Sequence, residues 1–360
     1  MKKIVTIVGA RPQFIKAAVV SRALSGKYNE ILVHTGQHYD HNMSDIFFEE
    51  MDIAKPKYNL GISGGTHGKM TGEMLIAIEE VLIGENPDMV LLYGDTNSTL
   101  AGALAAVKLH IPVCHVEAGN RLGTLENPEE INRITADHVS SILCACTESA
   151  MEFLKRENLN SRSHLVGDPM LDAFMYYSNK VGDVVPEKLT GIDELEYKIP
   201  GRFNYMTCHR EENTQDIMTL KEILEAVNSL DIPCIYSVHP RNHNKVMVLR
   251  DEFKNILFCK PVGYLMSVYL TNHCDKIITD SGGLQREAFF ARKQCITVFD
   301  HVVWPETMIN GCNQLALANK EDICNKLDRI IDFKNVGSPF GDGKASLNIV
   351  RVIDEFGGLK

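Results

Sequence analysis

The residues of this chain best suited to chemistry follow a short apolar run that ends at Ile278. The segment Thr279-Asp280-Ser281-Gly282-Gly283-Leu284-Gln285-Arg286-Glu287 predicts the end of a buried strand, a Ser-Gly-Gly turn and a helix. The first backbone N–H groups of such a helix can hold an anion, most often a phosphate. Glu287 would repel a phosphate and fits better as a hydrogen-bond acceptor for sugar hydroxyls, as on a ribose. The segment therefore favours a sugar nucleotide site, although a strand-turn-helix joint without a ligand is the alternative.

A second candidate anion site follows the first apolar run of the chain. Gly9-Ala10-Arg11-Pro12-Gln13-Phe14-Ile15-Lys16 places Pro12 early in a predicted helix. Arg11 and Lys16, near that helix N-terminus, would attract a phosphate or carboxylate group, although ordinary surface charges are the alternative. The chain has no G-x-G-x-x-G motif and no P-loop, so a site for NAD or ATP is poorly supported.

Two carboxylates stand at the ends of apolar runs. They are Asp95 in Gly94-Asp95-Thr96-Asn97 and Glu117 in His115-Val116-Glu117-Ala118-Gly119. We expect both to face one cleft from neighbouring strands, where burial and mutual repulsion push their proton affinities apart and supply an acid and a base. Two alternatives stay open: Asp95 caps the helix that begins near Thr99, or Glu117 has a structural role only.

Three further segments carry charged or nucleophilic side chains. Pro128-Glu129-Glu130-Ile131-Asn132-Arg133 opens a helix, where acidic residues are common, but it follows soon after the Glu117 loop. Cys208-His209-Arg210-Glu211-Glu212-Asn213 and Val238-His239-Pro240-Arg241-Asn242 each follow a strand and present a His and an Arg, a pair that suits a pyrophosphate leaving group. No further ligands at suitable spacing accompany these histidines, so we expect no metal. Cys208 is expected to be structural rather than catalytic.

The composition limits the class of protein. With 360 residues, 44% of them hydrophobic, the chain exceeds the usual size of one core, so two domains are expected. The formal net charge of -10 argues against nucleic acid or an anionic membrane as a partner. No run of about 18 apolar residues occurs, and the first residues predict a strand rather than a signal peptide, so we expect a cytoplasmic protein. The ten cysteines form no Cys-x-x-Cys motif and are expected to be reduced core residues.

Apolar runs alternate with amphipathic segments, which predicts an α/β chain of two doubly wound parallel sheets in tandem. The expected helices in the first half include Pro12 to Leu24, Gly68 to Gly84 and Thr99 to Leu109. The expected strands are Lys3 to Val8, Asn29 to His34, Met89 to Tyr93, Val113 to Glu117, Leu143 to Thr147, Asn204 to Thr207, Cys234 to Val238, Ile256 to Phe258, Lys276 to Ile278 and Cys295 to Val298. Ligands are expected at the carboxyl ends of these strands. Tyr177 to Arg202 is expected to be a solvated connection.

Eight strings follow one another in the order of a known family: GARPQFIK, TGQHYD, YGDTNSTLAGALAA, HVEAG, PEEINR, HREEN, VHPR and TDSGGLQREA. Up to about residue 310 the chain resembles the non-hydrolysing UDP-N-acetylglucosamine 2-epimerase family. The resemblance implies two Rossmann-like doubly wound domains in a GT-B arrangement with an interdomain active-site cleft. It places the N-terminal domain at residues 1–168 and the nucleotide-binding domain at residues 169–344, with a C-terminal helix at about 345–360 that packs back on the first domain. A homodimer is the expectation for the family.

The activity that the resemblance implies is inversion of C2 of a UDP-N-acetylhexosamine, gluco to manno, for surface polysaccharide synthesis. UDP is eliminated and added again through a 2-acetamidoglycal, and no cofactor is required. Proton handling would fall to Asp95, Glu117 and Glu129, and His209 would assist the departure of UDP. The substrate and UDP contacts would be Arg11 and Lys16 near the diphosphate, Ser281, Gly282 and Gly283 on phosphate, Glu287 on the ribose, and Arg133, Arg210 and His239.

The chain departs from the ordinary UDP-N-acetylglucosamine enzyme at two motifs and at Ser267, where an aromatic residue is expected. Gln-Glu-Glu becomes Gln285-Arg286-Glu287, and Arg-Asp-x-x-Glu-Arg-Pro-Glu becomes Phe299-Asp300-His301-Val302-Val303-Trp304-Pro305-Glu306. The segments Asn42 to Phe48, Tyr58 to Ile62 and Gly64 to Gly68 look more like the branch that acts on UDP-2,3-diacetamido-2,3-dideoxyglucuronic acid. The identity of the hexosamine is therefore open between these two substrates and another modified hexosamine.

Three other activities compete with the non-hydrolysing epimerase. A hydrolysing 2-epimerase would release UDP, a retaining glycosyltransferase would use the same fold with an acceptor, and a sugar nucleotide sensor would be non-catalytic. The three carboxylates disfavour the transferase, because transfer does not require proton exchange at C2. The presence of every motif acid and of His209 disfavours the sensor.

Overall fold

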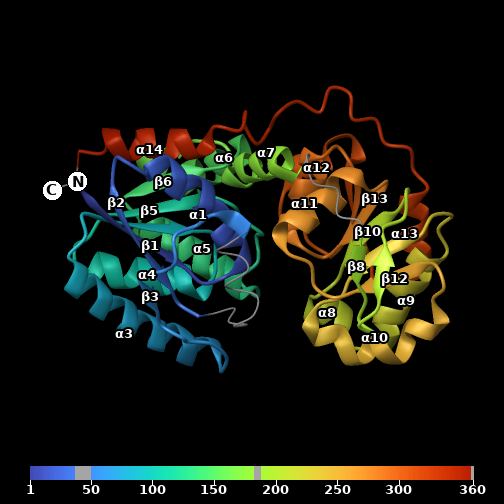
Figure 1. Cartoon of the computed structure of the whole chain (residues 1–360). Helices are drawn as coiled ribbons and strands as arrows, with labels where there is room; N and C mark the ends of the chain where they lie inside the picture. The colour runs from blue at the N-terminus through green and yellow to red at the C-terminus, as the bar shows by residue number, and fades with distance from the viewer. Residues whose placement is uncertain (37–49, 182–187, 358–360) are drawn as a thin grey trace. The chain divides into compact units, whose positions relative to one another are not determined.

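A computed structural model of the chain describes residues 1–36, 50–181 and 188–357. The chain forms two compact units, each with its own parallel sheet: Met1–Ala173 with Ser338–Lys360, and Phe174–Gly337 (Figure 1). The predicted class, α/β with two Rossmann-like domains, is confirmed. Residues 37–40 of the TGQHYD string and the whole segment Asn42 to Phe48 lie outside the described residues.

The first unit is built on seven parallel strands in the order β3-β2-β1-β4-β5-β6-β7. The strands are β1 (Lys3–Val8), β2 (Asn29–His34), β3 (Tyr58–Asn59), β4 (Met89–Tyr93), β5 (Val113–Ala118), β6 (Ile142–Ala145) and β7 (Ser163–Leu165). Every residue of β4 is buried, as expected for a central strand of a parallel sheet with both faces covered. The register pairs Ile7 with Leu92 and Tyr93 with Val116, so the carboxyl ends of β1, β4 and β5 lie side by side.

Helices alternate with these strands along the chain, as in a doubly wound fold. They are α1 (Arg11–Leu24), α3 (His67–Glu85), α4 (Asn97–Lys108), α5 (Pro128–Val139), α6 (Glu148–Arg156) and η1 (Asn160–Arg162). A further helix, α7 (Pro169–Val181), begins in this unit, and its residues from Phe174 on belong to the second. The last helix of the chain, α14 (Ala345–Glu355), also belongs to this unit and packs against α1. Asp172 fixes its start, because its carboxylate accepts the backbone N–H groups of Ala345 at 3.0 Å and Ser346 at 2.7 Å.

The second unit has six parallel strands in the order β12-β11-β10-β13-β14-β15. They are β10 (Asn204–Thr207), β11 (Cys234–Ser237), β12 (Ile256–Cys259), β13 (Lys276–Thr279), β14 (Gln294–Val298) and β15 (Asn313–Ala316). The helices are α8 (Glu211–Thr214), α9 (Ile217–Asn228), η2 (Pro240–Asn242), α10 (His243–Leu249), η3 (Arg250–Glu252), α11 (Tyr264–His273), α12 (Gly282–Phe290), η4 (Pro305–Gly311) and α13 (Lys320–Leu327). The register places the carboxyl end of β10 beside those of β11 and β13.

The expectation of a solvated connection from Tyr177 to Arg202 is wrong for its described residues. Part of it is the end of α7, and a further part forms an antiparallel hairpin, β8 (Lys188–Thr190) with β9 (Glu196–Lys198). Leu189 and Ile192 of the hairpin region are 4% exposed and pack into the core of the second unit. The charged residues around them hid these two anchors in the sequence.

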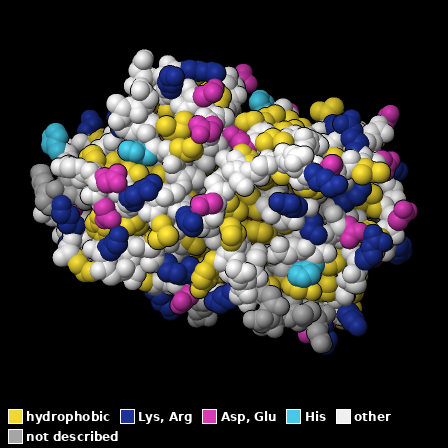
Figure 2. All heavy atoms as spheres, turned by 90° about the horizontal axis from the view of Figure 1, so that it is seen from above, with side chains coloured by type: hydrophobic (Ala, Val, Ile, Leu, Met, Phe, Trp, Pro, Cys, Tyr) yellow, Lys and Arg dark blue, Asp and Glu magenta, His cyan; other side chains and the backbone are white. Residues whose placement is uncertain are grey.

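Three whole-chain expectations can be compared with the described residues. All ten cysteines are free thiols, and nine of them are buried. No described helix combines the length and the apolar character that a membrane span requires. On the face shown in Figure 2, basic side chains are scattered among acidic and apolar ones rather than gathered in one patch.

Candidate active site

The carboxyl ends of β1 and β5 bring together two of the predicted residues. Lys16, on α1, forms an ion pair with Glu117 near the end of β5. The two side chains are only 3% and 9% exposed, so the alternative that Lys16 is an ordinary surface charge is wrong. A buried ammonium group without a partner is costly, and Glu117 supplies the negative charge that Lys16 needs. In return, Lys16 fixes the position of the Glu117 carboxylate.

The backbone of Glu117 is unusual. Its φ is +72°, in the left-handed region that residues other than glycine rarely adopt. The pairing of β5 with β6 shifts register between Val116 and Ala118, which is where a bulge turns a side chain away from the strand alternation. Such backbone strain costs about 1–3 kcal/mol and persists where the surrounding structure imposes it, often at active sites. No feature of the sequence indicated this bulge.

Two further polar residues lie beside Glu117. One ligand atom each of Glu117, Cys146 and Asp168 all lie within 4.8 Å of one another. Asp168 is fully buried and accepts the backbone N–H of Met170 at 2.8 Å, at the start of α7. Neither Cys146 nor Asp168 was predicted as a site residue, because they reach Glu117 from the end of β6 and from the loop before α7. Within this cluster, Glu117 pairs with the ammonium group of Lys16.

The second predicted acid, Asp95, follows β4 after one intervening residue, Gly94. Its carboxylate forms an ion pair with Arg133 of α5, and its backbone carbonyl accepts the side-chain amide of Asn132 at 2.9 Å. The same guanidinium group donates to the Glu130 carboxylate at 2.6 Å. Burial would lower the pKa of Arg133, but the charges and hydrogen bonds of Asp95 and Glu130 raise it. Arg133, predicted as a substrate contact, therefore holds Asp95, whose side chain is 30% exposed.

Asp95 does not cap the following helix, so that alternative is wrong. The helix α4 begins at Asn97, earlier than expected, and its N-cap is Thr96, whose hydroxyl accepts the Thr99 N–H at 3.3 Å. Thr96 therefore caps the N-terminus of α4. The Asp95 carboxylate is left to pair with Arg133.

The two glutamates at the start of α5 lie in different surroundings. Glu130 is buried and accepts the backbone N–H groups of Leu122 at 2.9 Å and Gly123 at 3.1 Å. It therefore fixes the loop that follows β5. Glu129 is exposed at the N-terminus of α5, and its proton-handling role stays a prediction.

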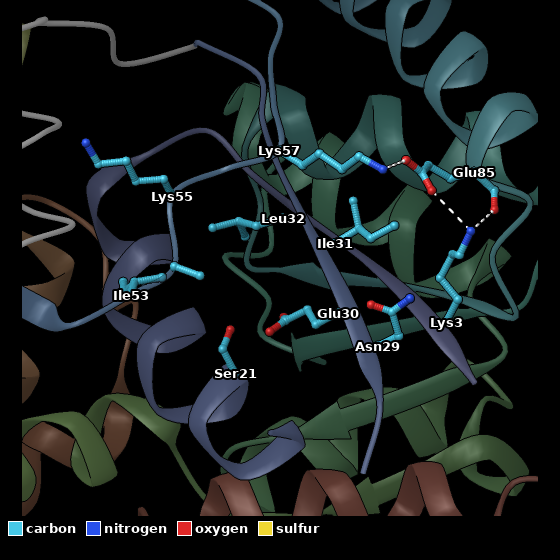
Figure 3. Close-up of a pocket in the computed structure, with 11 residues that line it drawn as sticks. Lys3, Ser21, Asn29, Glu30, Ile31, Leu32, Ile53, Lys55, Lys57 and Glu85 are labelled. Carbon is cyan, nitrogen blue, oxygen red and sulfur yellow. Dashed lines mark hydrogen bonds and ion pairs between the residues drawn. The ribbon is translucent and has the colours of Figure 1, made fainter. Parts of the chain in front are cut away.

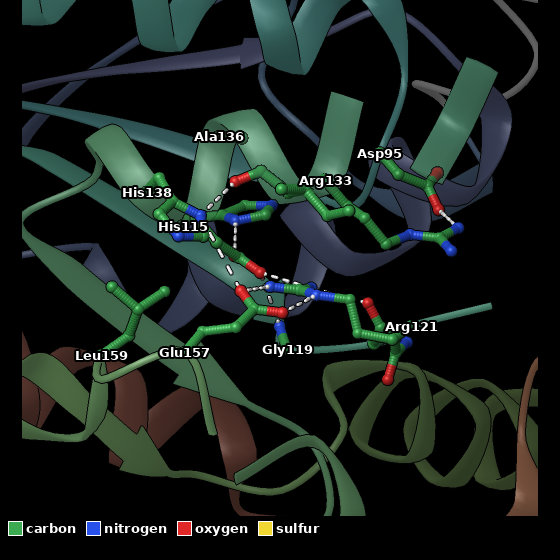
Figure 4. A network of polar contacts seen from close by, with 12 residues as sticks. Asp95, His115, Gly119, Arg121, Arg133, Ala136, His138, Glu157 and Leu159 are labelled. Atoms are coloured by element: carbon green, nitrogen blue, oxygen red, sulfur yellow. Dashed lines mark hydrogen bonds and ion pairs between the residues drawn. The ribbon is translucent and has the colours of Figure 1, made fainter. Parts of the chain in front are cut away.

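A buried network connects the loops that carry Asp95 and Glu117 (Figure 4). His115 is fully buried, with Nε2 2.6 Å from the carbonyl oxygen of Gly94 and Nδ1 2.7 Å from the Asp137 carboxylate. The other oxygen of Asp137 accepts the Gly119 N–H at 3.0 Å and an Arg121 N–H at 2.7 Å. Burial would raise the pKa of Asp137, but His115 and Arg121 lower it. The sequence analysis did not give His115 or Asp137 a role.

Arg11 is the first residue of α1 and is partly buried. The turn before it is fixed by Gln13, whose amide oxygen accepts the Gly9 N–H at 2.7 Å and the Ala10 N–H at 3.0 Å. The Gln13 amide nitrogen donates to the carbonyl oxygen of Tyr93 at 2.6 Å, which ties α1 to β4. The turn that carries Arg11 is therefore rigidly joined to the strand that precedes Asp95.

In the second unit, Asp280 organises the predicted residues at the ends of β10 and β13. Its carboxylate accepts the backbone N–H groups of His209 and Arg210, both at 2.8 Å, and lies 2.9 Å from Nδ1 of His209. Burial would raise the pKa of Asp280, but the His209 ring and the two backbone N–H groups lower it to about 2. His209 is thereby oriented with Nδ1 on Asp280, while its side chain stays 41% exposed.

His239, after β11, lies next to His209. The two rings are stacked with centroids 5.7 Å apart and an interplanar angle of 29°. Arg210 donates through Nε to the carbonyl oxygen of Asp280 at 2.8 Å and rests on the ring of Phe299 at 4.0 Å. The structure thus brings both predicted His-Arg motifs of this unit to one edge of its sheet.

The predicted anion turn is the N-terminus of α12. Ser281 is the N-cap, and its hydroxyl accepts the Leu284 N–H at 3.4 Å. Within the described part of the chain, the N–H groups of Gly282 and Gly283 make no hydrogen bond. A methyl group built on Gly282 or Gly283 would meet its nearest neighbour at 3.8 or 3.7 Å, an ordinary contact. The fold itself therefore does not require glycine at either position, which favours close approach of a ligand as the reason for both.

Glu287 is buried one turn further into α12. Its carboxylate accepts the hydroxyl of Tyr264 at 2.9 Å, and Tyr264 packs edge-on against Tyr177 with centroids 5.4 Å apart. This acceptor therefore lies in a fixed position close to the anion turn. The sugar contact predicted for Glu287 stays a prediction.

The carboxyl edges of the two sheets carry the residues that the sequence resemblance assigned to an epimerase. A comparison with known protein families shows which family the chain belongs to. The family model described as UDP-N-acetylglucosamine 2-epimerase matches residues 22–354. The chain belongs to this family.

Individual members of the family are similar to the chain over its whole length. A UDP-N-acetylglucosamine 2-epimerase homolog of Methanococcus maripaludis is 44% identical over 98% of this chain and 99% of its own. The UDP-2,3-diacetamido-2,3-dideoxy-D-glucuronate 2-epimerase of Pseudomonas aeruginosa is 43% identical with the same coverage, 98% and 99%. The crystal structure of the UDP-GlcNAc 2-epimerase of Methanocaldococcus jannaschii with UDP-GlcNAc and UDP has a TM-score of 0.87 and 39% identity, covering 98% of this chain and 100% of that one.

The departures from the epimerase motifs contact one another in the second unit. The guanidinium group of Arg286 lies 4.0 Å from the ring centroid of Trp304, and both side chains are buried. Phe299, the other aromatic departure, stacks with Arg210. Trp304 and Phe299, the aromatic residues that replace motif residues, therefore each contact an arginine of the same unit.

A surface pocket of this epimerase-family chain lies at the opposite, amino edge of the first sheet (Figure 3). It is lined by Lys3, Ser21, Asn29, Glu30, Ile31, Leu32, Ile53, Ala54, Lys55, Lys57 and Glu85. Glu85 binds both Lys3 at 3.1 Å and Lys57 at 2.6 Å, so much of the charge in the pocket is internally compensated. None of the predicted site residues lines it.

Proposed function

We propose that the protein is a non-hydrolysing 2-epimerase of a UDP-N-acetylhexosamine. The observation that carries the proposal is the buried Lys16–Glu117 ion pair on a strained strand end, beside the loop of Asp95. A methyl group built on Gly94, next to Asp95, would lie 3.5 Å from the Lys16 ammonium nitrogen and 3.7 Å from a Glu117 carboxylate oxygen. Two fixed carboxylates at one sheet edge suit proton removal and proton return at a carbon atom.

The second unit would hold the leaving group. The donors Gly282 N–H and Gly283 N–H, with the guanidinium of Arg210, suit the diphosphate of UDP, and His209 suits the bridging oxygen that gains negative charge. Asp280 supports this role, because it fixes Nδ1 of His209 and both backbone groups of the loop. Glu287, held by Tyr264, would accept ribose hydroxyls.

The proposed reaction has two mirrored steps. A carboxylate of the set Asp95, Glu117 and Glu129 removes the C2 proton while the C1–O bond breaks and its electron pair leaves with UDP. This gives a 2-acetamidoglycal. UDP then re-forms the C1–O bond as an acid of the same set returns a proton to the opposite face of C2. Each direction needs one carboxylate that accepts a proton and one carboxylic acid that donates a proton.

The substrate class follows from the relatives. The chain is about equally similar to proteins named for UDP-N-acetylglucosamine and for UDP-2,3-diacetamido-2,3-dideoxyglucuronate, so either sugar nucleotide is a candidate substrate. Action as a cytoplasmic homodimer stays a prediction from the sequence.

The test is a product assay with both sugar nucleotides. The purified protein is incubated with each, the sugar product is analysed by NMR, and free UDP is quantified by ion-exchange chromatography. We expect inversion at C2 with UDP retained on the product. Glu117→Gln should abolish the inversion, while Glu126→Gln, an exposed glutamate of the same region, should leave it unchanged. Stoichiometric UDP release would support the hydrolysing enzyme instead, and no conversion of either compound would contradict the proposal.

A further inference from the structure

We propose that His67 is a positioning residue for Asp95. It acts through the buried side-chain amides of Asn97 and Asn132. The inference rests on the proposed function in one respect, namely that Asp95 handles a proton at C2 of the sugar. His67 lies in the segment Gly64 to Gly68, which the sequence sets apart from the ordinary UDP-N-acetylglucosamine enzyme. No site residue was predicted in that segment.

Four residues form one continuous chain of hydrogen bonds. Nδ1 of His67, the first residue of α3, lies 3.2 Å from Nδ2 of Asn97, the first residue of α4. Oδ1 of Asn97 accepts Nδ2 of Asn132 at 3.1 Å. The same nitrogen of Asn132 donates to the backbone carbonyl oxygen of Asp95 at 2.9 Å. The chain therefore leads from an exposed residue of α3, through two helices that pack against one another, to the backbone of Asp95.

The direction of every hydrogen bond in this chain follows from its inner end. The carbonyl oxygen of Asp95 can only accept, so the Asn132 atom that faces it is the amide nitrogen. That nitrogen also donates to Asn97, which therefore turns its oxygen to Asn132 and its nitrogen to His67. Because the amide nitrogen of Asn97 can only donate, Nδ1 of His67 accepts, and the ring carries its proton on Nε2. An unprotonated imidazole nitrogen is the outermost acceptor of the chain.

The turn that carries Asp95 depends on anchors of this kind. Gly94 precedes it with a φ of +62°, a conformation that leaves the backbone of the turn to be fixed by its neighbours. Arg133 holds the carboxylate of Asp95 (Figure 4). Asn132, the preceding residue of α5, holds the carbonyl oxygen of Asp95. A change in the orientation of the Asn132 amide would therefore shift Asp95 relative to the groups with which it shares the reaction.

His67 fixes that orientation from outside the core. Asn97 and Asn132 are 4% and 5% exposed, so each of their amide groups depends on partners within the protein. Among the described residues, Nδ2 of Asn97 has His67 as its acceptor. Without the imidazole, the Asn97 amide can turn and exchange its nitrogen and oxygen, which would face Asn132 with a donor. The replacement of His67, an exposed side chain, opens no cavity in the core.

The experiment compares variants of the full-length protein by steady-state kinetics, with UDP-N-acetylglucosamine and with UDP-2,3-diacetamido-2,3-dideoxyglucuronic acid. His67→Ala removes the acceptor, so kcat should fall about 5- to 20-fold while KM changes less than about twofold. His67→Asn keeps an acceptor oxygen in the place of Nδ1 and should return kcat to within about twofold of the wild type. His164→Ala, which removes an exposed histidine from β7 of the same unit, should behave like the wild type.

A double-variant cycle tests whether His67 acts through Asn97. Asn97→Ala alone should lower kcat, and adding His67→Ala to it should lower kcat no further, because the chain is already broken. An equal further loss in that background would show that His67 acts by another route, and would overturn the inference. If Asn97→Ala does not fold, the comparison of His67→Ala with His67→Asn decides alone.

Two other results would also overturn the inference while the proposed function stands. They are an unchanged kcat in His67→Ala, and a rise of KM alone in that variant. Failure of His67→Asn to restore kcat would likewise exclude the acceptor as the reason for the effect. If the wild type converts neither sugar nucleotide, the proposed function fails together with the inference.

Discussion

Lys16 and Glu117 form an ion pair in the interior of the first unit, and the backbone of Glu117 is in the left-handed conformation. The pair joins the helix after β1 to the end of β5 across the carboxyl edge of the sheet. Lys16 was expected near a diphosphate, but its charge is already matched by Glu117 within this unit. Lys16 therefore fixes the Glu117 carboxylate, and its contact with a diphosphate stays a prediction.

Lys16→Met should remove C2 epimerisation and destabilise the first unit. The buried Glu117 carboxylate would lose its ion pair with Lys16, and breaking a buried ion pair costs about 3–5 kcal/mol. We expect the rate to fall by at least about 100-fold, which corresponds to 2.7 kcal/mol. Epimerisation and urea denaturation are the measurements. Lys27→Met is the control, since its ion pair with Asp354 is exposed and should contribute little. An active Lys16→Met variant would contradict the assignment.

Asp137→Asn should slow the reaction more than it weakens substrate binding. Asn cannot replace the negative charge that faces His115 and Arg121, so the loops of Gly94 and Gly119 lose their common anchor. We expect kcat to fall about 10- to 100-fold with a KM change below about threefold, as for a group that positions others. Steady-state kinetics separate the two. If only KM rises and kcat is unchanged, the network supports substrate binding rather than the positioning of the catalytic carboxylates.

Asp280→Asn should destabilise the second unit in a pH-dependent way. The pKa of Asp280 is lowered to about 2, below the value of about 3.9 in an unfolded chain, so the carboxylate stabilises the folded form above about pH 4. This contribution, about 2–3 kcal/mol, is lost as the pH falls from about 4 towards 2. Urea denaturation of wild type and variant at a series of pH values should show their difference narrowing over that range. A difference that stays constant with pH would rule out the charge as its source.

Gly283→Ala should separate binding from stability. The added methyl group meets only ordinary contacts, and alanine suits a helix better than glycine, so the free energy of unfolding should stay equal or rise by up to about 1 kcal/mol. The methyl group would nevertheless stand in the path of a phosphate. UDP affinity measured by calorimetry should fall, and Gly201→Ala, at an open position of the same unit, should leave it unchanged. If Gly283→Ala lowers the free energy of unfolding as well as the affinity for UDP, Gly283 is required by the fold.

The sheets could be predicted from the sequence where strands are continuous apolar runs. The bounds of β1, β2, β4 and β10 agree with the prediction. β15 was missed, because it begins with Asn313 and Gln314, which are buried through hydrogen bonds rather than by apolar character. The short β3 and β7 and the β8–β9 hairpin carry too few apolar residues to stand out.

The site could be predicted as far as parallel topology decides it. Residues that follow strands meet at one sheet edge, which placed Glu117 beside the Asp95 loop. His209 and Asp280 also follow neighbouring strands, but their contact was not predicted. The bulge at Glu117 and the approach of Asp168 could not be predicted, because both depend on contacts between segments far apart in the chain. The same holds for Arg286 on Trp304.

The most direct test of the central claim is exchange of the C2 proton with solvent. The protein is incubated with UDP-N-acetylglucosamine, and separately with UDP-2,3-diacetamido-2,3-dideoxyglucuronic acid, in D2O, and C2 is followed by NMR. For at least one of the two sugar nucleotides, we predict that deuterium appears at C2 of both the substrate and its epimer and that UDP stays attached. The Glu117→Gln variant should incorporate no deuterium. Epimerisation that proceeds with the original proton kept at C2, or exchange that survives in Glu117→Gln, would contradict it.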